Sequence, residues 1–331
     1  MKKVFITDYI LNADIEKEII GKHAEVICLD SPNEKDLPEI ISEADGILVW
    51  HTEINKSTIE KLKNCKSIIR YGVGYDNIDV KYLTSKKINF ANTPDYGTEE
   101  VADTASAFIL NFIRKINFYD NFLKKNNKWQ EEVINLNKFN PIKRTSDHKL
   151  GIIGLGRIGS ALALRMKGFK MNVGFYDPEA QTGVEKIFGI KRYDSLEELA
   201  FECNIISINA TLNDSSKGMI DKKFIDQIKK GTVIVNTARG AIIKNLDALL
   251  YGLKKGKLEG VGLDVLPDEP PEYNHEFFKS WLDKKNPLSD KILINPHAGY
   301  FSSSSIIEMR EKAAKNMLLS LLGKKIKNII K

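Results

Sequence analysis

The stretch that decides the fold is GIIGLGRIG at residues 151–159, near the middle of the 331-residue chain. Its first residues form a short apolar run typical of a buried strand, and the glycines that follow have the spacing GxGxxG. Residues 160–167 continue with helical periodicity, and Asp177 ends a second apolar run at residues 173–176. A strand, a glycine loop, a helix and an acid at the end of the next strand together predict a dinucleotide-binding βαβ unit.

Each glycine of this loop has a physical reason to be there. Gly154 permits the tight turn, Gly156 lets a pyrophosphate approach the backbone, and Gly159 allows the helix to pack closely on the strand. Arg157 and Ile158 lie between the second and third glycines and belong to the same cofactor loop. The N-terminus of the helix offers free N–H groups and a partial positive charge to phosphates.

Asp177 lies 18 residues after Gly159, where an acid can accept hydrogen bonds from the adenosine ribose hydroxyls. Its charge would repel a 2′-phosphate, and no basic residue follows it directly. We therefore predict NAD as the cofactor, with NADP less favoured.

Apolar runs and helical stretches alternate along nearly the whole chain, the rhythm of parallel α/β sheets. A chain of this length predicts two domains. One long helix is predicted at residues 101–117, and a polar segment rich in Asn and Lys follows it up to about residue 147. The predicted strands are residues 4–7, 25–29, 47–50, 66–70, 151–153, 173–176, 205–208, 233–235, 260–263 and 292–294, and a helix over residues 305–322 closes the chain.

The composition excludes several classes of protein. With 42% hydrophobic and 28% charged residues the chain is neither disordered nor fibrous, and no apolar run is long enough to span a membrane. The net charge of +6 comes from dispersed lysines with only eight arginines, so we expect no nucleic-acid partner. The three cysteines, Cys28, Cys65 and Cys203, are far apart, which predicts a reducing, cytoplasmic setting and no metal site.

Polar side chains follow three of the later predicted strands. Arg239 comes after residues 233–235, Asp264 ends residues 260–263 with Glu269 just beyond, and His297 follows the last strand. Each residue alone would more often be an ordinary surface or structural residue. Parallel strands deliver their carboxyl ends to one edge of the sheet, however, and that edge is where open α/β sheets bind ligands.

These motifs together resemble the D-isomer-specific 2-hydroxyacid dehydrogenase family, and the resemblance covers nearly the whole chain. Within the family, the chain is most similar to the C-terminal-binding-protein corepressors through His51-Thr52, Arg70, GFYDP at 174–178 and SIIEMR at 305–310. The family motifs are GLGRIG at 154–159, NTARGA at 236–241, LDVLPDEP at 263–270, PHAG at 296–299, RYGVGYDNID at 70–79, NTP at 92–94 and EVADT at 100–104.

The resemblance implies a discontinuous architecture. Residues 1–97 plus 298–331 would form a flavodoxin-like substrate-binding domain, interrupted by a Rossmann NAD-binding domain at residues 98–297. Both would be doubly wound parallel sheets, with the active site in the cleft between them. The family's usual dimer implies a homodimer, and its chemistry implies a small 2-oxo or 2-hydroxy acid as the substrate.

The resemblance also assigns roles. His297 would be the general acid and base, Glu269 would orient its ring, and Arg239 would bind the substrate carboxylate. The backbone N–H groups of Tyr71, Gly72, Val73 and Gly74 would cradle that carboxylate, with His51, Arg70 and Tyr300 as further substrate-binding residues. Asp264 would hold the nicotinamide carboxamide, while Thr104, Thr211, Thr237, Ala238, His297 and Gly299 would line the cofactor.

The sequence departs from the family motifs at two places, and two alternative functions stay open. Many family members have His-x-Pro-Leu where this chain has NATL at 209–212, and the corepressors carry Trp where it has Tyr300. A corepressor-like NAD-sensing scaffold is one alternative, which the set of Arg239, Glu269 and His297 does not exclude. A dehydrogenase for another small hydride donor, such as formate, is the other, although those relatives carry Gln in place of Glu269. An NAD-dependent oxidoreductase that interconverts a 2-oxo acid and a D-2-hydroxy acid is the leading prediction.

Overall fold

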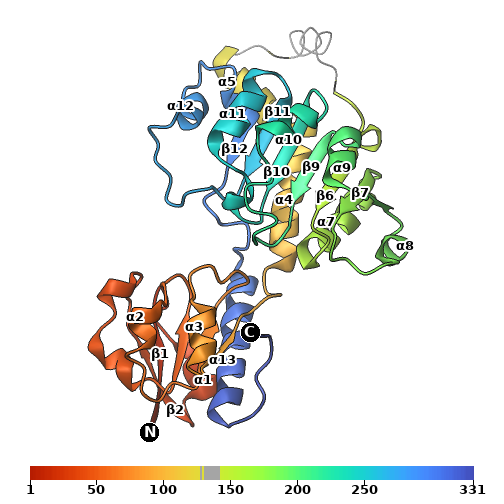
Figure 1. Ribbon diagram of the computed structural model, residues 1–331. Helices are drawn as coiled ribbons and strands as arrows, with labels where there is room; N and C mark the ends of the chain where they lie inside the picture. The colour runs from red at the N-terminus through yellow and green to blue at the C-terminus, as the bar shows by residue number, and fades with distance from the viewer. Residues whose placement is uncertain (127–128, 130–141) are drawn as a thin grey trace. The chain divides into compact units, whose positions relative to one another are not determined.

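The computed structural model describes residues 1–126, 129 and 142–331. The chain divides into two compact units, one of Met1–Gly97 with Phe301–Lys331 and one of Thr98–Tyr300 (Figure 1). The second unit thus lies within the sequence of the first, and the chain returns to the first unit three residues later than the predicted boundary at 298. Residues 127–128 and 130–141 of the predicted polar segment that follows residue 117 lie outside the described residues.

The first unit is built on a six-stranded sheet with the order β13-β5-β4-β3-β1-β2. Every pairing is parallel except the one between β13 and β5. The order β2-β1-β3-β4-β5 is that of flavodoxin, whose ligands bind at the β1/β3 switch point. The strands are β1 (Lys2–Ile6), β2 (Ala24–Cys28), β3 (Gly46–Val49), β4 (Ser67–Arg70), β5 (Asn89–Ala91) and β13 (Ile329–Ile330).

Helices cover this sheet because its strands are apolar on both faces; all four residues of β3 are buried. The closing helix α13 (Ser303–Leu321) begins with a capping box between Ser302 and Ser305 and packs against α1 (Asp14–Ile20). The other helices are η1 (Glu34–Asp36), η2 (Glu39–Glu43), α2 (Lys56–Ile59) and α3 (Val80–Ser85).

The second unit is built on a seven-stranded, fully parallel sheet with the order β12-β11-β10-β9-β6-β7-β8. The chain order of the strands reverses between β6 and β9, as in the Rossmann fold, and a dinucleotide binds at that point in such sheets. The strands are β6 (Lys149–Ile153), β7 (Asn172–Tyr176), β8 (Lys191–Arg192), β9 (Ile205–Ile208), β10 (Thr232–Asn236), β11 (Leu258–Leu263) and β12 (Ile292–Ile294).

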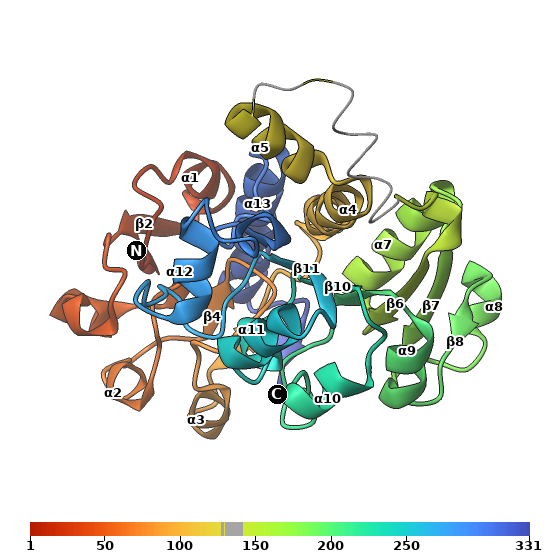
Figure 2. The same ribbon diagram turned by 90° about the horizontal axis from the view of Figure 1, so that it is seen from above.

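Helices pack on both faces of this sheet (Figure 2). On one face lie α4 (Thr98–Arg114) and α7 (Arg157–Gly168), which also contact each other. The other face is covered by α9 (Leu196–Glu202), α10 (Lys222–Gln227), α11 (Leu246–Lys254) and α12 (Glu276–Leu282). The remaining elements are α5 (Ile116–Asn126), α8 (Val184–Phe188), η3 (Thr145–Asp147), η4 (Gly240–Ile242) and η5 (Ser289–Lys291).

The α/β fold with two parallel sheets is confirmed, and the differences are local. The single helix predicted at 101–117 is wrong: α4 ends at Arg114 and α5 begins at Ile116, because Lys115 between them has a φ of 55° and leaves the right-handed helix. The strands β8 and β13 were not predicted, because β8 is two basic residues and β13 is only two isoleucines, too short a run to indicate a strand.

Two predictions from composition can be compared with the described residues. None of their helices is both long and apolar enough to cross a membrane. All three cysteines are unpaired thiols, and Cys65 and Cys203 are buried.

Candidate active site

The glycine loop lies at the point where the strand order of the second sheet reverses. Gly154 has a φ of 90°, and a Cβ there would lie 2.7 Å from the backbone of Ala210, at the end of β9. A Cβ on Gly159 would lie 2.2 Å from the Gly154 carbonyl oxygen, so only glycine lets α7 approach the loop this closely. At Gly156, by contrast, a Cβ would meet nothing within 4 Å, which leaves room for a ligand beside the backbone.

Asp177 is fixed against this loop. Its Oδ2 accepts a hydrogen bond from the backbone N–H of Leu155 (2.8 Å), and its Oδ1 accepts one from that of Glu179 (2.9 Å). Each carboxylate oxygen can accept a second hydrogen bond. The carboxylate is therefore held in place and can still receive the two hydroxyls of a ribose.

Two buried polar atoms lie at the ends of neighbouring strands in this region. They are Asn209 Oδ1, after β9, and Thr237 Oγ1, after β10, and neither has a hydrogen-bond partner among the described residues. Buried polar groups in native proteins are nearly always paired, by protein, water or ligand. Together with the open backbone at Gly156, these two atoms fit a polar ligand such as a dinucleotide.

The turn that carries Arg239 is tied down by Asn236, the last residue of β10, which is fully buried. Asn236 Oδ1 accepts from the backbone N–H of Ala238 (3.0 Å), and its Nδ2 donates to the Arg239 carbonyl (3.0 Å). The Arg239 guanidinium also donates from Nη1 to the Ala238 carbonyl (2.8 Å). The backbone of residues 237–239 is thus fixed where Arg239 leaves the strand.

Glu269 and His297 form a direct pair, with Glu269 Oε2 2.7 Å from His297 Nδ1. The other oxygen of Glu269 accepts from the backbone N–H of Leu266 (2.7 Å), so both carboxylate oxygens are held. Burial alone would raise the pKa of Glu269, but the hydrogen bond and charge of His297, with smaller effects of Leu266 and Arg239, lower that pKa overall. Glu269 is therefore ionised at neutral pH, where its hydrogen bond orients the imidazole ring.

Asp264 supports the turn that carries His297. Its Oδ1 accepts from the Asn295 amide (2.6 Å) and from the backbone N–H groups of Ala298 (3.0 Å) and Gly299 (2.9 Å). The side chain is buried, which raises the pKa of Asp264, although the His297 charge and these hydrogen bonds oppose that rise. A Cβ on Gly299 would lie 2.5 Å from Asp264 Oδ2, so the close contact requires glycine.

The predicted contact of Asp264 with the nicotinamide carboxamide stays a prediction. What the structure adds is a second role, because three donors from residues 295–299 occupy one of its oxygens. The backbone N–H of His297 also donates to the Asp264 carbonyl (2.8 Å), and His297 itself has a φ of 53°. Asp264 therefore holds His297 in a conformation that side-chain-bearing residues rarely adopt.

Other predicted residues lie around this turn. Thr104 of α4 donates from Oγ1 to the Gly299 carbonyl (3.2 Å), and the Tyr300 ring lies edge-on to that of His297, with centroids 6.5 Å apart. Thr211 follows β9, and its carbonyl accepts from Ser216 Oγ (2.7 Å). Arg157 and Ile158 open α7.

The remaining predicted substrate-binding residues belong to the first unit, and the structure corrects two of them. The Tyr71 N–H donates to the Val49 carbonyl (2.8 Å), and the Gly72 N–H donates to that of Arg70 (3.1 Å), so neither is available to a carboxylate. The Tyr71 ring is fully buried, with its hydroxyl donating to Glu16 (2.8 Å). Among the described residues, the N–H groups of Val73 and Gly74 donate to no other group.

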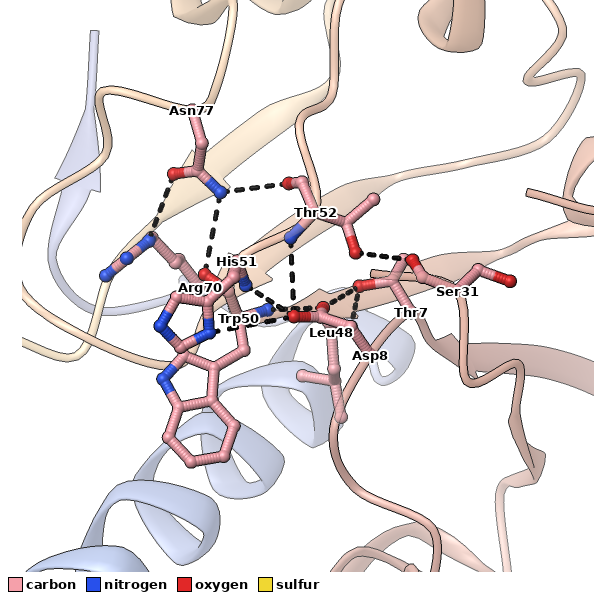
Figure 3. Close-up of polar contacts among 9 residues, drawn as sticks. All are labelled: Thr7, Asp8, Ser31, Leu48, Trp50, His51, Thr52, Arg70 and Asn77. Atoms are coloured by element: carbon pink, nitrogen blue, oxygen red, sulfur yellow. Dashed lines mark hydrogen bonds and ion pairs between the residues drawn. The ribbon is translucent and has the colours of Figure 1, made fainter. Parts of the chain in front are cut away.

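His51 and Arg70 both lie at strand ends, in a network that Figure 3 shows. The buried Asp8, which follows β1, accepts the backbone N–H of His51 (2.6 Å). Asn77 Oδ1 accepts from Arg70 Nε (3.2 Å), and its Nδ2 donates to the Thr52 carbonyl (2.9 Å).

Known proteins are similar to this chain in sequence over nearly its whole length. A family defined as D-isomer specific 2-hydroxyacid dehydrogenase, NAD binding domain, matches residues 106–299. A glyoxylate reductase of Thermococcus litoralis is 33% identical over 99% of this chain and 96% of its own length. The chain belongs to the D-isomer specific 2-hydroxyacid dehydrogenase family.

Other relatives also match nearly the whole chain, in sequence or in structure. A glyoxylate reductase of Pyrococcus horikoshii is 32% identical over 96% of this chain and 92% of its own. The crystal structure of a D-lactate dehydrogenase from Aquifex aeolicus, complexed with NAD and lactic acid, superposes with a TM-score of 0.81 at 28% identity, covering 97% of this chain and 96% of its own. A glyoxylate reductase from Paecilomyes thermophila gives a TM-score of 0.85 at 25% identity, covering 99% of this chain and 98% of its own.

Membership of the D-isomer specific 2-hydroxyacid dehydrogenase family makes the chain an NAD(P)-dependent oxidoreductase that interconverts 2-oxo acids and D-2-hydroxy acids. The relatives named above are reductases and a dehydrogenase rather than corepressors, so they carry the family assignment but not the predicted corepressor subgroup.

In this dehydrogenase the structure joins Glu269 to His297 and holds Asp177 against the glycine loop. Sequence reasoning missed residues that support the Arg239 turn and the strand ends of the first unit, and one buried residue beside the cofactor loop. A signal was available for Asn236, a polar residue at the end of an apolar strand. The other missed residues are Asn209 beside the cofactor loop and Asp8, Glu16 and Asn77 in the first unit.

Proposed function

We propose that this chain reduces a 2-oxo acid with NADH as the preferred cofactor, with His297, Glu269 and Arg239 as its catalytic residues. One observation carries the proposal: the pair of Glu269 and His297, joined at 2.7 Å, follows strands of the same sheet whose glycine loop fits a dinucleotide. The names of the two archaeal relatives favour glyoxylate or a similarly small 2-oxo acid among the substrates.

The reaction needs a hydride at the carbonyl carbon and a proton at its oxygen. Bound NADH supplies the hydride. His297 donates its Nδ1–H to Glu269, which leaves Nε2 to give a proton to the carbonyl oxygen in reduction and to take one from the hydroxyl in oxidation. Because Glu269 is ionised, it stabilises the imidazolium that reduction requires.

Arg239 is proposed to bind the substrate carboxylate through its guanidinium, a group suited to bidentate recognition. The backbone N–H groups of Val73 and Gly74, in the first unit, stay proposed as substrate-binding groups. Tyr300 is proposed to contact the substrate beside His297, as its ring position relative to the imidazole allows.

The preference for NAD over NADP rests on Asp177, whose fixed carboxylate would repel a 2′-phosphate. We propose that the second unit is the NAD-binding domain and the first the substrate-binding domain. A homodimer and a cytoplasmic location also stay proposals, the first from the family and the second from the three unpaired cysteines.

The test is a panel of 2-oxo acids, including glyoxylate, pyruvate and hydroxypyruvate, assayed by the loss of NADH absorbance. We expect at least one substrate to be reduced far faster by the wild type than by His297→Ala. If no substrate exceeds the His297→Ala background, the corepressor-like scaffold replaces the enzyme as the better account. Oxidation of formate without turnover of hydroxy acids would favour the other alternative.

A further inference from the structure

The loop that begins with Asp177, residues 177–183, connects β7 to α8 in the second unit. Figure 2 shows β7, the edge strand β8 and α8 together at one end of the second sheet. Two backbone hydrogen bonds brace this Asp177 loop, from the Ala180 N–H to the Asp177 carbonyl and from the Val184 N–H to the Gln181 carbonyl, and both are 3.4 Å long. Well-formed bonds of this kind measure about 2.7–3.2 Å, so these two alone hold the loop only weakly.

Arg192 of β8 supplies the stronger support. Its guanidinium donates from Nη1 to the Asp177 carbonyl (3.3 Å) and from Nη2 to the carbonyls of Ala180 (3.3 Å) and Gln181 (2.7 Å). One planar group thus joins three carbonyls of the Asp177 loop. The rigid fork of donors in arginine suits this geometry, whereas lysine offers one flexible ammonium.

Arg192 is itself fixed to the strand that leads to Asp177. It pairs with Phe175 of β7 in the sheet, and its guanidinium lies over the Phe175 ring, 4.8 Å from the ring centroid. Its Nε donates to Glu185 Oε2 (3.2 Å), which also accepts the Gly183 N–H (3.2 Å). The Arg192 side chain is only 25% exposed, so these contacts are partly shielded from solvent.

We propose that Arg192 is a positioning residue of the cofactor site, which holds the Asp177 loop so that the Asp177 carboxylate faces the adenosine ribose of NADH. The inference rests on the proposed function and deepens it, because it assigns the preference for NADH to Asp177 and Arg192 together. The N–H groups of Leu155 and Glu179 fix the carboxylate of Asp177, and Arg192 fixes its carbonyl. Four of the five guanidinium N–H donors are used in this way, so Arg192 acts on the cofactor through the loop.

The charge of Arg192 alone would have the opposite effect. A cation near the adenosine ribose attracts a 2′-phosphate, so loss of the charge alone would weaken NADPH binding and strengthen the preference for NADH. Loss of the support for the loop instead weakens the hydrogen bonds from Asp177 to the ribose hydroxyls and reduces its repulsion of a 2′-phosphate. The Kd for NADPH then comes closer to that for NADH, so the two explanations differ in sign.

The test is a fluorescence titration with NADH and with NADPH in the absence of substrate. Arg192→Met keeps an apolar side chain over Phe175 and removes the donors to the loop. We expect it to raise the Kd for NADH about tenfold, the size of one charge-assisted hydrogen bond, and to change the Kd for NADPH by less than about twofold.

Two further variants separate position from charge. Arg192→Lys keeps the charge but not the fork of donors, and its Kd for NADH should stay closer to that of Arg192→Met than to that of the wild type. Lys191→Met is the matched control, because it removes a cation of the same strand that pairs with Glu198 and Glu202 instead. It should bind both nucleotides as the wild type does.

A double mutant tests whether Arg192 acts through Asp177. Once Asp177→Asn has removed the carboxylate, adding Arg192→Met should change the ratio of the two Kd values by less than about twofold. If Arg192→Met does not fold, Glu185→Ala, which removes the carboxylate that holds Arg192 Nε, should raise the Kd for NADH by about threefold and decides the question in its place.

The outcomes separate this inference from the function on which it rests. If the wild type binds NADPH as tightly as NADH, the proposed preference for NADH fails, and the effect of Arg192→Met on the NADH Kd still decides whether Arg192 positions the loop. If Arg192→Met leaves the NADH Kd unchanged, weakens the binding of both nucleotides equally, or is matched by full activity of Arg192→Lys in NADH binding, the proposed function stands and this inference is wrong.

Discussion

Replacing Glu269 with Gln should displace the pH dependence of 2-oxo acid reduction. In the structure one oxygen of Glu269 accepts the Leu266 N–H, and the other pairs with His297 at 2.7 Å. An amide oxygen held by Leu266 would leave its NH₂ group facing His297 Nδ1, which then has to accept. The variant would therefore lack the carboxylate that accepts the Nδ1–H of the imidazolium in the wild type.

The magnitude follows from the exposure of the pair. A charge-assisted hydrogen bond contributes about 1.5–3 kcal/mol and an exposed ion pair about 0.2–1 kcal/mol. The two side chains are 41% and 36% exposed, so solvent screens the pair and about 1–1.5 kcal/mol is the appropriate value. Because one pH unit corresponds to about 1.4 kcal/mol, the shift should be about one unit.

The sign is fixed by the reaction. Reduction needs protonated His297, so kcat/KM falls as the pH rises, and without the Glu269 charge that fall should come about one unit lower. The pKa of Glu269 is lowered, so the wild-type carboxylate stays ionised across a profile measured from pH 5.5 to 9. Glu272→Gln, which changes an exposed acid of the same segment, is the matched control. Superimposable profiles for Glu269→Gln and the wild type would show that the Glu269 charge does not influence the proton donor.

Three further predictions concern the cofactor site and the first unit. Gly159→Ala should raise the Kd for NADH at least about tenfold in a fluorescence titration, because its Cβ would lie 2.2 Å from the Gly154 carbonyl, whereas Gly168→Ala, whose Cβ meets nothing, should bind normally. Asp177→Asn should weaken NADH binding and bring the Kd for NADPH closer to that for NADH. An unchanged ratio of the two Kd values would show that Asp177 does not set the preference for NADH. Glu16→Gln should lower the free energy of unfolding by about 2–4 kcal/mol in urea, because the buried Glu16 is the main partner of Arg310 and raises the pKa of that guanidinium. Destabilisation below about 0.5 kcal/mol would show that this pair is not needed for folding.

The parts of the fold that could be predicted are those encoded by local patterns. Short apolar runs predicted most strands of both sheets, and the spacing of GxGxxG to Asp177 placed a βαβ unit whose loop and acid do contact each other. The two-residue strands β8 and β13 are too short to show such a run. Lys115 breaks a helix whose apolar spacing continues on both sides of it.

The supporting residues of the site could not be predicted, because their partners are distant in sequence. Asp8 binds N–H groups more than 40 residues away, and Glu16 pairs with Arg310 across 294 residues. The glycine-rich loop that contains Tyr71 and Gly72 predicted backbone N–H groups that bind a carboxylate. Only the structure shows that the N–H groups of these two residues donate to backbone carbonyls instead. Strand-end position therefore indicates which residues can reach a ligand, but not which of them hold the others in place.

The most direct test of the catalytic assignment is Arg239→Ala, measured for both NADH binding and reduction of the best 2-oxo acid. Asn236 fixes the turn through the backbone and not through the Arg239 guanidinium, so the substitution should leave the cofactor site intact. We expect an NADH Kd within about twofold of the wild type together with turnover reduced by at least about a thousandfold. Equal loss of cofactor binding and turnover, or turnover that persists, would show that Arg239 does not bind the substrate carboxylate.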